Sequence, residues 1–330
     1  MNHRMKRPWL APLVPLYTAA VAFRNRRFDR SSAAIRRLAR PVVSIGNICA
    51  GGSGKTPLVI ALAQALCTRG LHVDVLSSGY GRQSASPARV DPKGSARDFG
   101  DEPLLIARAA QVSVYVAPQR YEAGLLAEAV APLAPPAAHL LDDGFQHRQL
   151  ARDVDILLIS SADLDDRLLP AGNLRESLHA AARAHILAVP DDDPSLEETL
   201  RARGLHQPIW RLRRVMDTPA VDGPVLAFCG IARPAQFFAG IETAGLALSG
   251  RIAFRDHQPY THADLDRLLA QARATRSAAL LTTEKDAVRL APLFAAAPPS
   301  IPLLTASLRI EIENMPAALD WLLARIRVLP

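Results

Sequence analysis

Residues 41–56 read PVVSIGNICAGGSGKT, an apolar run that leads directly into a glycine-rich loop. The run at 41–46 is typical of a short buried strand, and residues 56–66 carry apolar side chains at helical spacing. A strand, a glycine-rich loop and a helix in this order predict a phosphate-binding loop, because the loop amides and the helix N-terminus can surround phosphate oxygens. The stretch therefore indicates an α/β protein with a nucleotide site.

Each residue of this loop has an expected role. Glycines let the backbone approach the phosphates, Lys55 would reach the terminal phosphates, and Thr56 would place its hydroxyl on Mg²⁺. Cys49 stands where the strict pattern G-x-x-x-x-G-K-[ST] has its first glycine, but the flanking strand and helix favour a nucleotide site over a turn that binds nothing. The residues predicted to hold ATP are Cys49, Ala50, Gly51, Gly52, Ser53, Gly54, Lys55 and Thr56.

A metal-related strand end is predicted downstream of the loop. Residues 138–144 read AHLLDDG, an apolar strand that ends in two carboxylates and a glycine. A phosphate loop needs an acidic residue at the end of a neighbouring strand to hold the shell of Mg²⁺. Asp142 and Asp143 are therefore interpreted as metal ligands together with Thr56, and a solvated turn is the alternative.

Strand and helix signals alternate along the following sequence. Apolar runs at 71–76, 112–116, 139–141 and 154–159 predict further strands, and residues 119–130 predict a helix. Strands separated by helices imply right-handed crossovers. The predicted fold class is α/β, similar to the P-loop NTPases, with a mainly parallel sheet and helices on both faces.

The character of the sequence changes near residue 190. Residues 191–198 are acidic and indicate a solvated stretch, and 208–224 indicates a linker or an extended connection. A second, smaller α/β unit is predicted from strands at 225–230 and 278–283 and a closing helix at 315–326. We expect an N-terminal segment at 1–30, a P-loop domain at 31–215 and a second α/β domain at 216–330.

Composition and charge narrow the class of protein. The 330 residues are 49% hydrophobic and 22% charged, as in folded globular proteins. The net charge of +7 favours anionic partners or reflects an arginine-rich genome, while dispersed arginines and only 5% aromatic residues argue against nucleic-acid binding. The cysteines form neither a disulfide framework nor a metal pair and indicate a reducing compartment; they are Cys49, Cys67 and Cys229.

The N-terminus is a separate chemical unit. Residues 8–23 carry no charge, and basic residues flank them on both sides. These 16 residues are fewer than the roughly 20 that a membrane-spanning helix needs, and Pro12 and Pro15 disturb a regular helix. A segment that lies on an anionic membrane surface is the favoured interpretation. A signal peptide and a helix packed only on its own domain are the alternatives.

Several further motifs carry a specific resemblance. They follow one another as SIGN at 44–47, SSGYGR at 77–82, GDEP at 100–103, DDGFQHR at 142–148, LLPAGNLRE at 168–176, GIARP at 230–234, DH at 256–257 and TTEKDAV at 282–288. With these motifs, nearly the whole chain resembles the tetraacyldisaccharide 4'-kinase family of Gram-negative bacteria. Ser78 departs from the arginine that is common in that family, and Cys49 departs from a threonine.

The resemblance implies transfer of the ATP γ-phosphate to the 4'-hydroxyl of tetraacyldisaccharide 1-phosphate, which gives lipid IVA in lipid A biosynthesis. It also implies Mg²⁺, a membrane-associated N-terminal helix and two α/β domains around a cleft. The implied base is Asp101, acting with His257, although Asp101 also suits the N-terminus of a helix. Lys55, Arg120 and Arg175 are candidate cations for the transferring phosphoryl group. The remaining candidates are Glu102 for the metal, and Arg82, Gln146 and His147.

A nucleotide switch and a nucleic-acid-binding protein are the two alternatives to a kinase. A nucleotide switch would need a guanine-reading motif such as Asn-Lys-x-Asp or a water-positioning residue, and no convincing one is present. A nucleic-acid-binding protein is disfavoured by the composition. We therefore expect a peripheral or monotopic enzyme at the cytoplasmic face of the bacterial inner membrane. Its partners would be a lipid substrate and an anionic membrane surface, without nucleic acid or an obligate protein partner.

Overall fold

The sheet is the frame on which the site is built. A computed structural model of the chain describes residues 7–31, 34–52, 54–130, 136–296 and 301–326. Its strands form one 12-stranded sheet in the order β10-β9-β11-β12-β8-β7-β6-β1-β5-β2-β4-β3. The antiparallel pairs are β8 with β12 and β3 with β4, and the other named pairs are parallel.

The bounds of the elements follow the alternation that the sequence predicts. The strands are β1 (Val42–Asn47), β2 (His72–Ser77), β3 (Ala88–Arg89), β4 (Ser113–Val116), β5 (Ala137–Asp142), β6 (Val154–Leu158), β7 (Ile186–Pro190), β8 (Ile209–Asp217), β9 (Val225–Cys229), β10 (Leu248–Ala253), β11 (Ala279–Thr283) and β12 (Leu303–Ile312). The α-helices are α1 (Val14–Arg30), α2 (Lys55–Thr68), α3 (Ala96–Phe99), α4 (Asp101–Ala110), α5 (Arg120–Val130), α6 (Ser161–Leu164), α7 (Pro194–Ala202), α8 (Pro234–Thr243), α9 (His262–Ala274), α10 (Glu284–Ala296) and α11 (Met315–Leu323).

Both faces of the sheet are buried around β1. Val43 and Ile45 belong to one core with α2, α4 and α11, whereas Val42 belongs to another core with α5. Successive side chains of a strand point to opposite faces, so this division follows from the strand period of two. A parallel strand covered on both faces reads as a continuous apolar run, which is the pattern seen at 41–46. The predicted α/β class with a mostly parallel sheet is confirmed.

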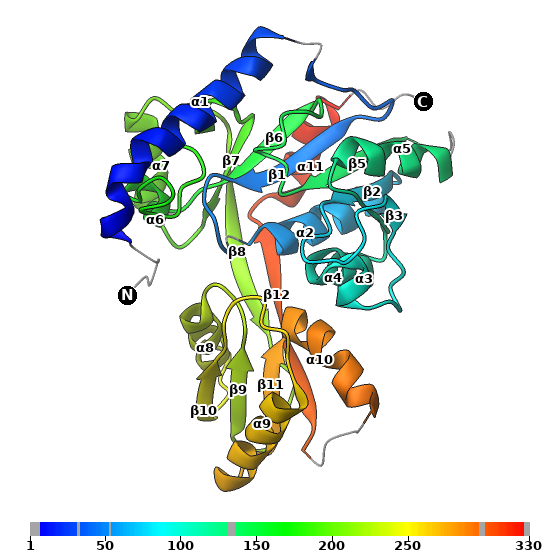
Figure 1. Cartoon of the computed structure of the whole chain (residues 1–330), viewed down its shortest axis with the longest axis vertical. Helices are drawn as coiled ribbons and strands as arrows, with labels where there is room; N and C mark the ends of the chain where they lie inside the picture. The colour runs from blue at the N-terminus through cyan, green and yellow to red at the C-terminus, as the bar shows by residue number, and fades with distance from the viewer. Residues whose placement is uncertain (1–6, 32–33, 53, 131–135, 297–300, 327–330) are drawn as a thin grey trace.

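Two long strands join an upper half of the molecule to a lower half (Figure 1). The upper half holds β1–β7 and α1–α7, the lower half holds β9–β11 and α8–α10, and β8 and β12 run between them. Six residue pairs, from Ser307 opposite Asp217 to Ile312 opposite Leu212, align these two strands. In the lower half, separate apolar clusters cover the two faces of β9.

The structure gives more detail on the predicted boundaries. The stretch 208–224, predicted as a linker or an extended connection, contains the extended strand β8, which belongs to the sheet and runs between the two halves. The last part of 216–330 returns to the upper half, because α11 packs into the core of β1 and α2 through Ala318, Leu319 and Leu322. The acidic stretch also enters a helix, α7, whose Leu196 and Leu200 are buried.

The N-terminal segment folds as a helix on the outside of the upper half. A 3₁₀ turn at Pro8–Leu13 leads into α1, and neither element contains a buried residue. Trp9, Leu16 and Phe23 remain 72%, 73% and 77% exposed, respectively. Among the described residues, no helix combines the length and apolar character needed to cross a membrane.

Polar contacts anchor α1 to the loops that follow it in the upper half. The Tyr17 hydroxyl donates to the backbone carbonyl of Arg175 at 3.0 Å, and the Asn25 amide donates to buried Glu176 at 2.8 Å. Arg148 donates to the Asn25 carbonyl at 3.2 Å and pairs with Asp29. The helix therefore touches the segment that carries Arg175 while its apolar side chains face solvent.

Candidate active site

The phosphate loop lies at the carboxyl end of β1, where parallel α/β sheets bind their ligands. β1 ends at Asn47 and α2 begins at Lys55. Gly51 has φ +105° and Gly54 has φ +90°, a left-handed conformation that glycine adopts without strain. Thr56 is buried in the first turn of α2. Of the eight predicted ATP-binding residues, only Ser53 lies outside the described residues.

Lys55 lies among acceptors at the end of the sheet. Its Nζ is 3.2 Å from Asn47 Oδ1 and 3.4 Å from Asp143 Oδ1. Asn47 ends β1, and Asp143 directly follows β5, the neighbouring strand in the sheet. The sheet therefore brings the lysine and the predicted metal-related carboxylates together, as the sequence predicts.

Asp142 is a buried carboxylate whose two oxygens differ in their contacts. Its Oδ2 accepts from Ser77 at 3.1 Å, while its buried Oδ1 has no hydrogen-bond partner among the described residues. Burial, together with the charges of Glu102 and Asp143, raises the pKa of Asp142 to about 7. Such a carboxylate is suited to bind a positive ion, because the ion would remove the cost of its negative charge.

Asp143 is charged and held by two cations. Arg175 donates to its Oδ2 at 2.9 Å, and Lys55 lies beside its other oxygen. Although burial opposes ionisation, the charges of Lys55 and Arg175 hold the pKa of Asp143 below its ordinary value. Gln146 completes the loop, because it accepts from Arg175 at 3.3 Å and donates to the Asn47 carbonyl at 2.9 Å.

The predicted pair Asp101 and His257 meets although 156 residues separate the two positions. Asp101 is the first residue of α4, and His257 Nδ1 lies 3.1 Å from its Oδ2. Arg289, on α10, donates from Nε to the same oxygen at 3.0 Å. The upper half supplies the carboxylate, and the lower half supplies the histidine and the arginine.

The two partners shift each other's titration. Burial opposes the charge on Asp101, but the hydrogen bond from His257 and the charge of Arg289 hold the pKa of Asp101 well below its ordinary value. The hydrogen bond that His257 donates to Asp101 raises the pKa of His257 despite partial burial of the ring. The pair therefore keeps an ionised carboxylate next to a histidine that protonates readily.

The other predicted cations lie at different places around this edge of the sheet. Burial lowers the pKa of Arg120. The negative charges of Asp143 and Asp142 lie near enough to raise it in part. The Nε atom of Arg120 and the Nε2 atom of His147 are buried without hydrogen-bond partners among the described residues. Arg82 packs against Gly79, and its buried terminal nitrogens likewise lack partners there. Arg175 is thus the predicted arginine that contacts a site carboxylate directly.

Glu102, the remaining metal candidate, pairs with Lys285 of α10. The charges of Glu102, Asp101 and Asp142 all raise the pKa of Lys285, although its burial acts in the opposite direction. Lys285 is therefore near enough to carboxylates of both groups, Asp142 and Asp101, to interact with their charges. Among the described residues, no group of three or more His, Cys, Asp or Glu side chains forms a metal cluster.

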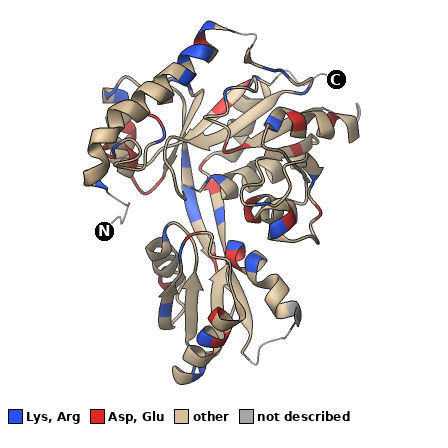
Figure 2. Ribbon diagram, in the orientation of Figure 1, with Lys and Arg blue, Asp and Glu red and all other residues tan. Residues whose placement is uncertain are grey.

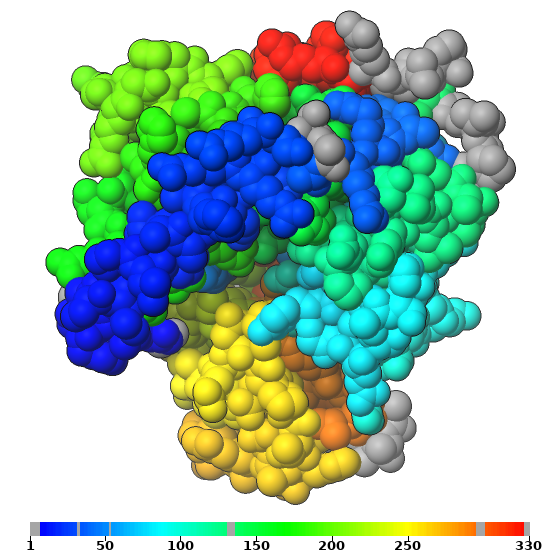
Figure 3. All heavy atoms as spheres, turned by 45° about the horizontal axis from the view of Figure 1, so that its top comes forward, coloured from blue at the N-terminus to red at the C-terminus, as the bar shows by residue number. Residues whose placement is uncertain are grey.

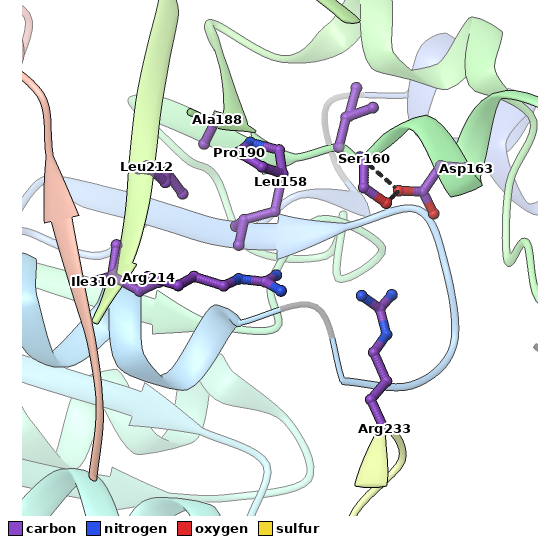
Figure 4. A pocket seen from close by; sticks show the side chains of 10 residues that line it. Leu158, Ser160, Asp163, Ala188, Pro190, Leu212, Arg214, Arg233 and Ile310 are labelled. Atoms are coloured by element: carbon purple, nitrogen blue, oxygen red, sulfur yellow. Dashed lines mark hydrogen bonds between the residues drawn. The ribbon is translucent and has the colours of Figure 1, made fainter. Parts of the chain in front are cut away.

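Several contacts of the site are absent from the sequence prediction. Arg289 was missed, although its spacing of three residues from Asp286 on a helix places the two on one face, where they pair at 2.9 Å. Arg214 of β8 was missed as well, and its Nη2 lies 3.5 Å from the position that a Cβ on Gly54 would take. Arg214 and Arg233, from opposite ends of a small pocket, point into the space beside the phosphate loop (Figure 4).

The lower half touches the phosphate loop directly. The Ala232 Cβ lies 3.7 Å and 3.6 Å from where Cβ atoms on Gly51 and Gly52 would stand. Figure 2 marks basic positions in blue along β8, the strand that carries Arg211, Arg213 and Arg214. Figure 3 shows a recess between α1, the residues coloured cyan and the yellow part of the lower half. The site is thus built from both halves and combines a phosphate loop, a carboxylate pair and a carboxylate–histidine pair.

Comparisons with known proteins show the family of the chain. The model of the family described as "LpxK: Tetraacyldisaccharide-1-P 4'-kinase" matches residues 6–327. The chain is 42% identical to the tetraacyldisaccharide 4'-kinase of Koribacter versatilis over 94% of this chain and 96% of the relative. It is 40% identical to that of Anaeromyxobacter sp. (strain Fw109-5), over 97% of this chain and 93% of the relative.

A solved structure is similar over nearly the whole length. The crystal structure of LpxK from Aquifex aeolicus in complex with ATP superimposes with a TM-score of 0.73 at 30% sequence identity. The match covers 96% of this chain and 98% of that chain. From the family match, the relatives and the shared fold together, the chain belongs to the tetraacyldisaccharide-1-P 4'-kinase family.

Proposed function

We propose that this protein transfers the γ-phosphate of ATP to the 4'-hydroxyl of tetraacyldisaccharide 1-phosphate and so forms lipid IVA in lipid A biosynthesis. The observation that carries the proposal is the position of the Asp101–His257 pair. It lies across from a phosphate loop, and Lys285 lies near carboxylates of both groups. A protein that only hydrolyses nucleotide has no second substrate whose hydroxyl must be activated. It would therefore not need a carboxylate from one half and a histidine from the other to accept a proton from that hydroxyl.

The phosphate loop would bind the nucleotide. Its backbone amides and the N-terminus of α2 would hold the phosphates, with Lys55 at the terminal phosphates. The Thr56 hydroxyl and the unpartnered Oδ1 of Asp142 fit Mg²⁺, which is usually bound by few protein groups together with phosphate oxygens and water. Bound Mg²⁺ would neutralise charge on the phosphates. Glu102 would act at a distance, since its carboxylate already pairs with Lys285.

The Asp101–His257 pair would accept the proton of the attacking hydroxyl. A bond forms between the 4'-oxygen and the γ-phosphorus, the bond from that phosphorus to the bridging oxygen breaks, and ADP leaves with the electron pair. Because its lowered pKa makes the Asp101 carboxylate a weak base, Asp101 would stay ionised and orient His257, whose pKa is raised, to accept the proton. Arg175, held against Asp143, and Arg120 would stabilise charge on the transferring phosphoryl group.

The exposed N-terminal helix would bring the enzyme to its lipid. Trp9, Leu16 and Phe23 on 8–30 present apolar surface, and arginines near the end of α1 suit anionic headgroups. A peripheral or monotopic position on the cytoplasmic face of the bacterial inner membrane follows, with ATP supplied from the cytosol. No nucleic acid and no obligate protein partner are part of the proposal. The lower half would act as a second domain that closes over the sugar headgroup and excludes water.

The decisive experiment follows phosphate from γ-labelled ATP into detergent-dispersed tetraacyldisaccharide 1-phosphate. The wild type is expected to form the bisphosphorylated lipid. Lys55→Ala and Asp101→Ala are each expected to lower kcat by about 10²–10⁴-fold while the protein stays folded, because each removes a group that acts on the transition state. Hydrolysis of ATP without any labelled lipid would instead support a nucleotide hydrolase.

A further inference from the structure

Arg289 of α10 contacts both halves of the molecule beside the proposed catalytic pair. Its side chain is only 8% exposed. Nε and Nη2 of its guanidinium both donate to Oδ2 of Asp101, the first at 3.0 Å. Nη1 donates to Asp286 Oδ1 and to the Gly230 carbonyl, each at 2.9 Å. Because the donors of a guanidinium form a rigid planar fork, the group that holds Nη1 also fixes the position of the Asp101 carboxylate.

Asp286 is the anchor of this arginine. The carboxylate is fully buried, and both of its oxygens are used. Besides Arg289, it accepts from the Tyr260 hydroxyl at 2.9 Å, the Thr283 hydroxyl at 2.6 Å and the Gly230 N–H at 3.1 Å. A Cβ at Gly230 would stand 3.1 Å from both the Asp286 oxygen and the Tyr260 hydroxyl, so the surroundings are closely packed. The anchor is therefore rigid.

The backbone of His257 is tied to the same carbonyl group. The His257 N–H donates to the Gly230 carbonyl at 3.2 Å, and Arg289 donates to that oxygen as well. His257 has φ +56°, a left-handed conformation that is strained for a residue with a side chain. Such a conformation persists where the surrounding contacts fix it. Arg289 thus connects the carboxylate of Asp101 with the backbone that carries the histidine.

The geometry assigns the ring proton of His257. The Asp101 carboxylate is ionised and can only accept, so Nδ1 of the ring, 3.1 Å from Oδ2, is the donor. Arg289 Nη2 lies 3.4 Å from Nδ1 and has no lone pair to accept with. In the neutral ring the lone pair is therefore on Nε2. Asp256 Oδ1 lies 3.8 Å from Nε2, beyond the distance of a hydrogen bond.

The charges near His257 oppose one another. Asp101 of α4, Arg289 of α10 and the adjacent Asp256 act on the ring, and the Tyr80 ring packs edge-on against it at 5.7 Å. The hydrogen bond to Asp101 and the charges of the two aspartates raise the pKa of His257, whereas partial burial and the charge of Arg289 lower it. A base has to be unprotonated when its substrate arrives, so a cation that limits protonation of the ring favours proton acceptance.

We propose that Arg289 is a positioning residue for the transfer reaction: anchored by Asp286, it fixes the Asp101 oxygen that receives Nδ1–H of His257 and so presents Nε2 to the acceptor hydroxyl. This inference rests on the proposed function and names its proton-accepting atom. In the transfer step the hydroxyl proton moves to Nε2, the 4'-oxygen bonds to the γ-phosphorus, and ADP leaves with the electron pair of the broken bond. The resulting imidazolium is stabilised by the Asp101 carboxylate.

The first test measures phosphate transfer from γ-labelled ATP to the detergent-dispersed lipid by Arg289→Ala. kcat is expected to fall about 10–100-fold, because displacement of a catalytic group by about 1 Å can cost up to about a hundredfold. KM for ATP and for the lipid should change less than about threefold, because the lost interaction acts in the transition state.

The titration of His257 separates positioning from general support of the fold. Loss of the Arg289 charge raises the pKa of His257, so the acidic limb of the kcat profile should move to higher pH in Arg289→Ala. NMR of the ligand-free protein, labelled with ¹⁵N in histidine, should show the same upward shift. In the wild type, the neutral His257 ring should carry its proton on Nδ1. A purely structural role would lower kcat by one factor at every pH and leave this titration unchanged.

Arg289→Lys separates charge from geometry and also carries the test if Arg289→Ala does not fold. Lysine keeps the charge but lacks the fork that reaches Asp101 and Asp286 together. The His257 titration should stay close to that of the wild type, while kcat should still fall about tenfold. The matched control is Arg255→Ala, which removes an exposed arginine two residues before His257. It should change kcat less than about twofold, because exposed charges are screened.

The outcomes decide between the alternatives. A loss of kcat without a matching change in KM, together with an upward shift of the His257 titration in Arg289→Ala, supports the proposal. Wild-type kcat in either Arg289 variant, or a His257 titration in Arg289→Ala that stays in place or moves to lower pH, would overturn it. A neutral wild-type ring protonated on Nε2 would overturn it too. A wild type that never labels the lipid would refute the kinase proposal, whereas the ligand-free NMR titration would still decide whether Arg289 acts on His257.

Discussion

At the scale of single residues, the properties of the site depend on which charges are brought together. Asp101 and His257 have ordinary pKa values far apart, 3.8 and 6.5, yet each stabilises the charged form of the other. Arg289 contributes to the same oxygen of Asp101 and also donates to the Gly230 carbonyl at 2.9 Å. The arginine therefore fixes the carboxylate against the lower half.

Replacing Asp101 by asparagine is expected to lower the pKa of His257. The hydrogen bond that His257 donates to Asp101 has the largest effect on the pKa of His257, so its loss leaves partial burial to favour the neutral ring. NMR titration of the His257 ring protons measures this change. Asp256→Asn serves as the control, because that carboxylate lies 3.8 Å from the other ring nitrogen and contributes less. An unchanged His257 titration in Asp101→Asn would contradict the assignment of the hydrogen bond.

Asp142 gives a prediction about pH and stability. Its pKa rises from 3.8 to about 7 on folding, so stability is fully present below the lower value and declines as pH rises through the upper one. Without nucleotide and Mg²⁺, Asp142→Asn should be more stable than the wild type at pH 8 by roughly 1–3 kcal/mol, the cost of an unsatisfied buried group. The same variant should lose most kinase activity.

Chemical denaturation between pH 4 and pH 8 measures this effect. The difference in unfolding free energy between Asp142→Asn and wild type should be small near pH 4 and grow toward pH 8, since only the wild type ionises there. Adding Mg²⁺ and ATP should narrow the difference, because bound cation compensates the charge of Asp142. A variant that is less stable at pH 8 would show that the carboxylate is already satisfied in the free protein.

At the scale of elements, α1 combines an outward apolar surface with an inward polar attachment. Its attachment uses Tyr17 and Asn25, which reach the segment of Arg175 and Glu176. Glu176 is buried and also pairs with Arg183 at 3.0 Å. The helix is therefore held to the catalytic half by hydrogen bonds, and its apolar side chains are left for another surface.

Adding charge to the apolar surface of α1 is expected to release the protein from membranes. Leu16→Glu combined with Phe23→Glu places two carboxylates where burial in the interface is proposed, so flotation with vesicles of anionic phospholipid should recover much less protein. Arg26→Gln is the control for a simple change of charge and should have a smaller effect. Equal flotation of the double variant and the wild type would mean that another surface binds the membrane.

At the scale of the whole molecule, two ion pairs between α10 and α4 are among the contacts that join the halves beside the site. Arg289 pairs with Asp101, and Lys285 pairs with Glu102. The substitution Lys285→Glu places a second carboxylate beside Glu102. The repulsion between the two carboxylates is expected to move the halves apart beside the site. Small-angle scattering should then show no decrease in radius of gyration when ATP and lipid bind, in contrast to the wild type.

A pair inside the lower half is the matched control for that experiment. Arg251→Glu breaks the exposed contact with Glu242, and both partners of this pair belong to the same half. The Arg251→Glu variant is therefore expected to show the same decrease in radius of gyration as the wild type when ATP and lipid bind. If wild-type scattering itself does not change with both ligands, the halves form a rigid cleft and the proposed closure is wrong.

Much of the frame could be predicted because it depends on local or periodic patterns. The buried run of β1, the loop glycines and the apolar face of α2 all lie within residues 41–66. By contrast, β7, β10 and β12 were not predicted. β12 is only partly buried, so its sequence lacks the continuous apolar run that predicts a buried strand. Its partner β8 lies far away in the chain, so their pairing cannot be predicted from neighbouring residues. The return of α11 to the upper half was missed for the same reason.

By itself, the sequence determined the glycine-rich loop between a strand and a helix, the carboxylates at the end of β5 and the α/β class, because each is encoded by neighbouring residues and by the period of a strand or helix. The motifs also identified Asp101 and His257 as a candidate pair. Only the tertiary structure decided that Arg289 binds Asp101 across 188 positions and that Arg214 and Arg233 lie beside the phosphate loop. Such contacts depend on how the two halves pack, and distance along the chain carries no information about that packing.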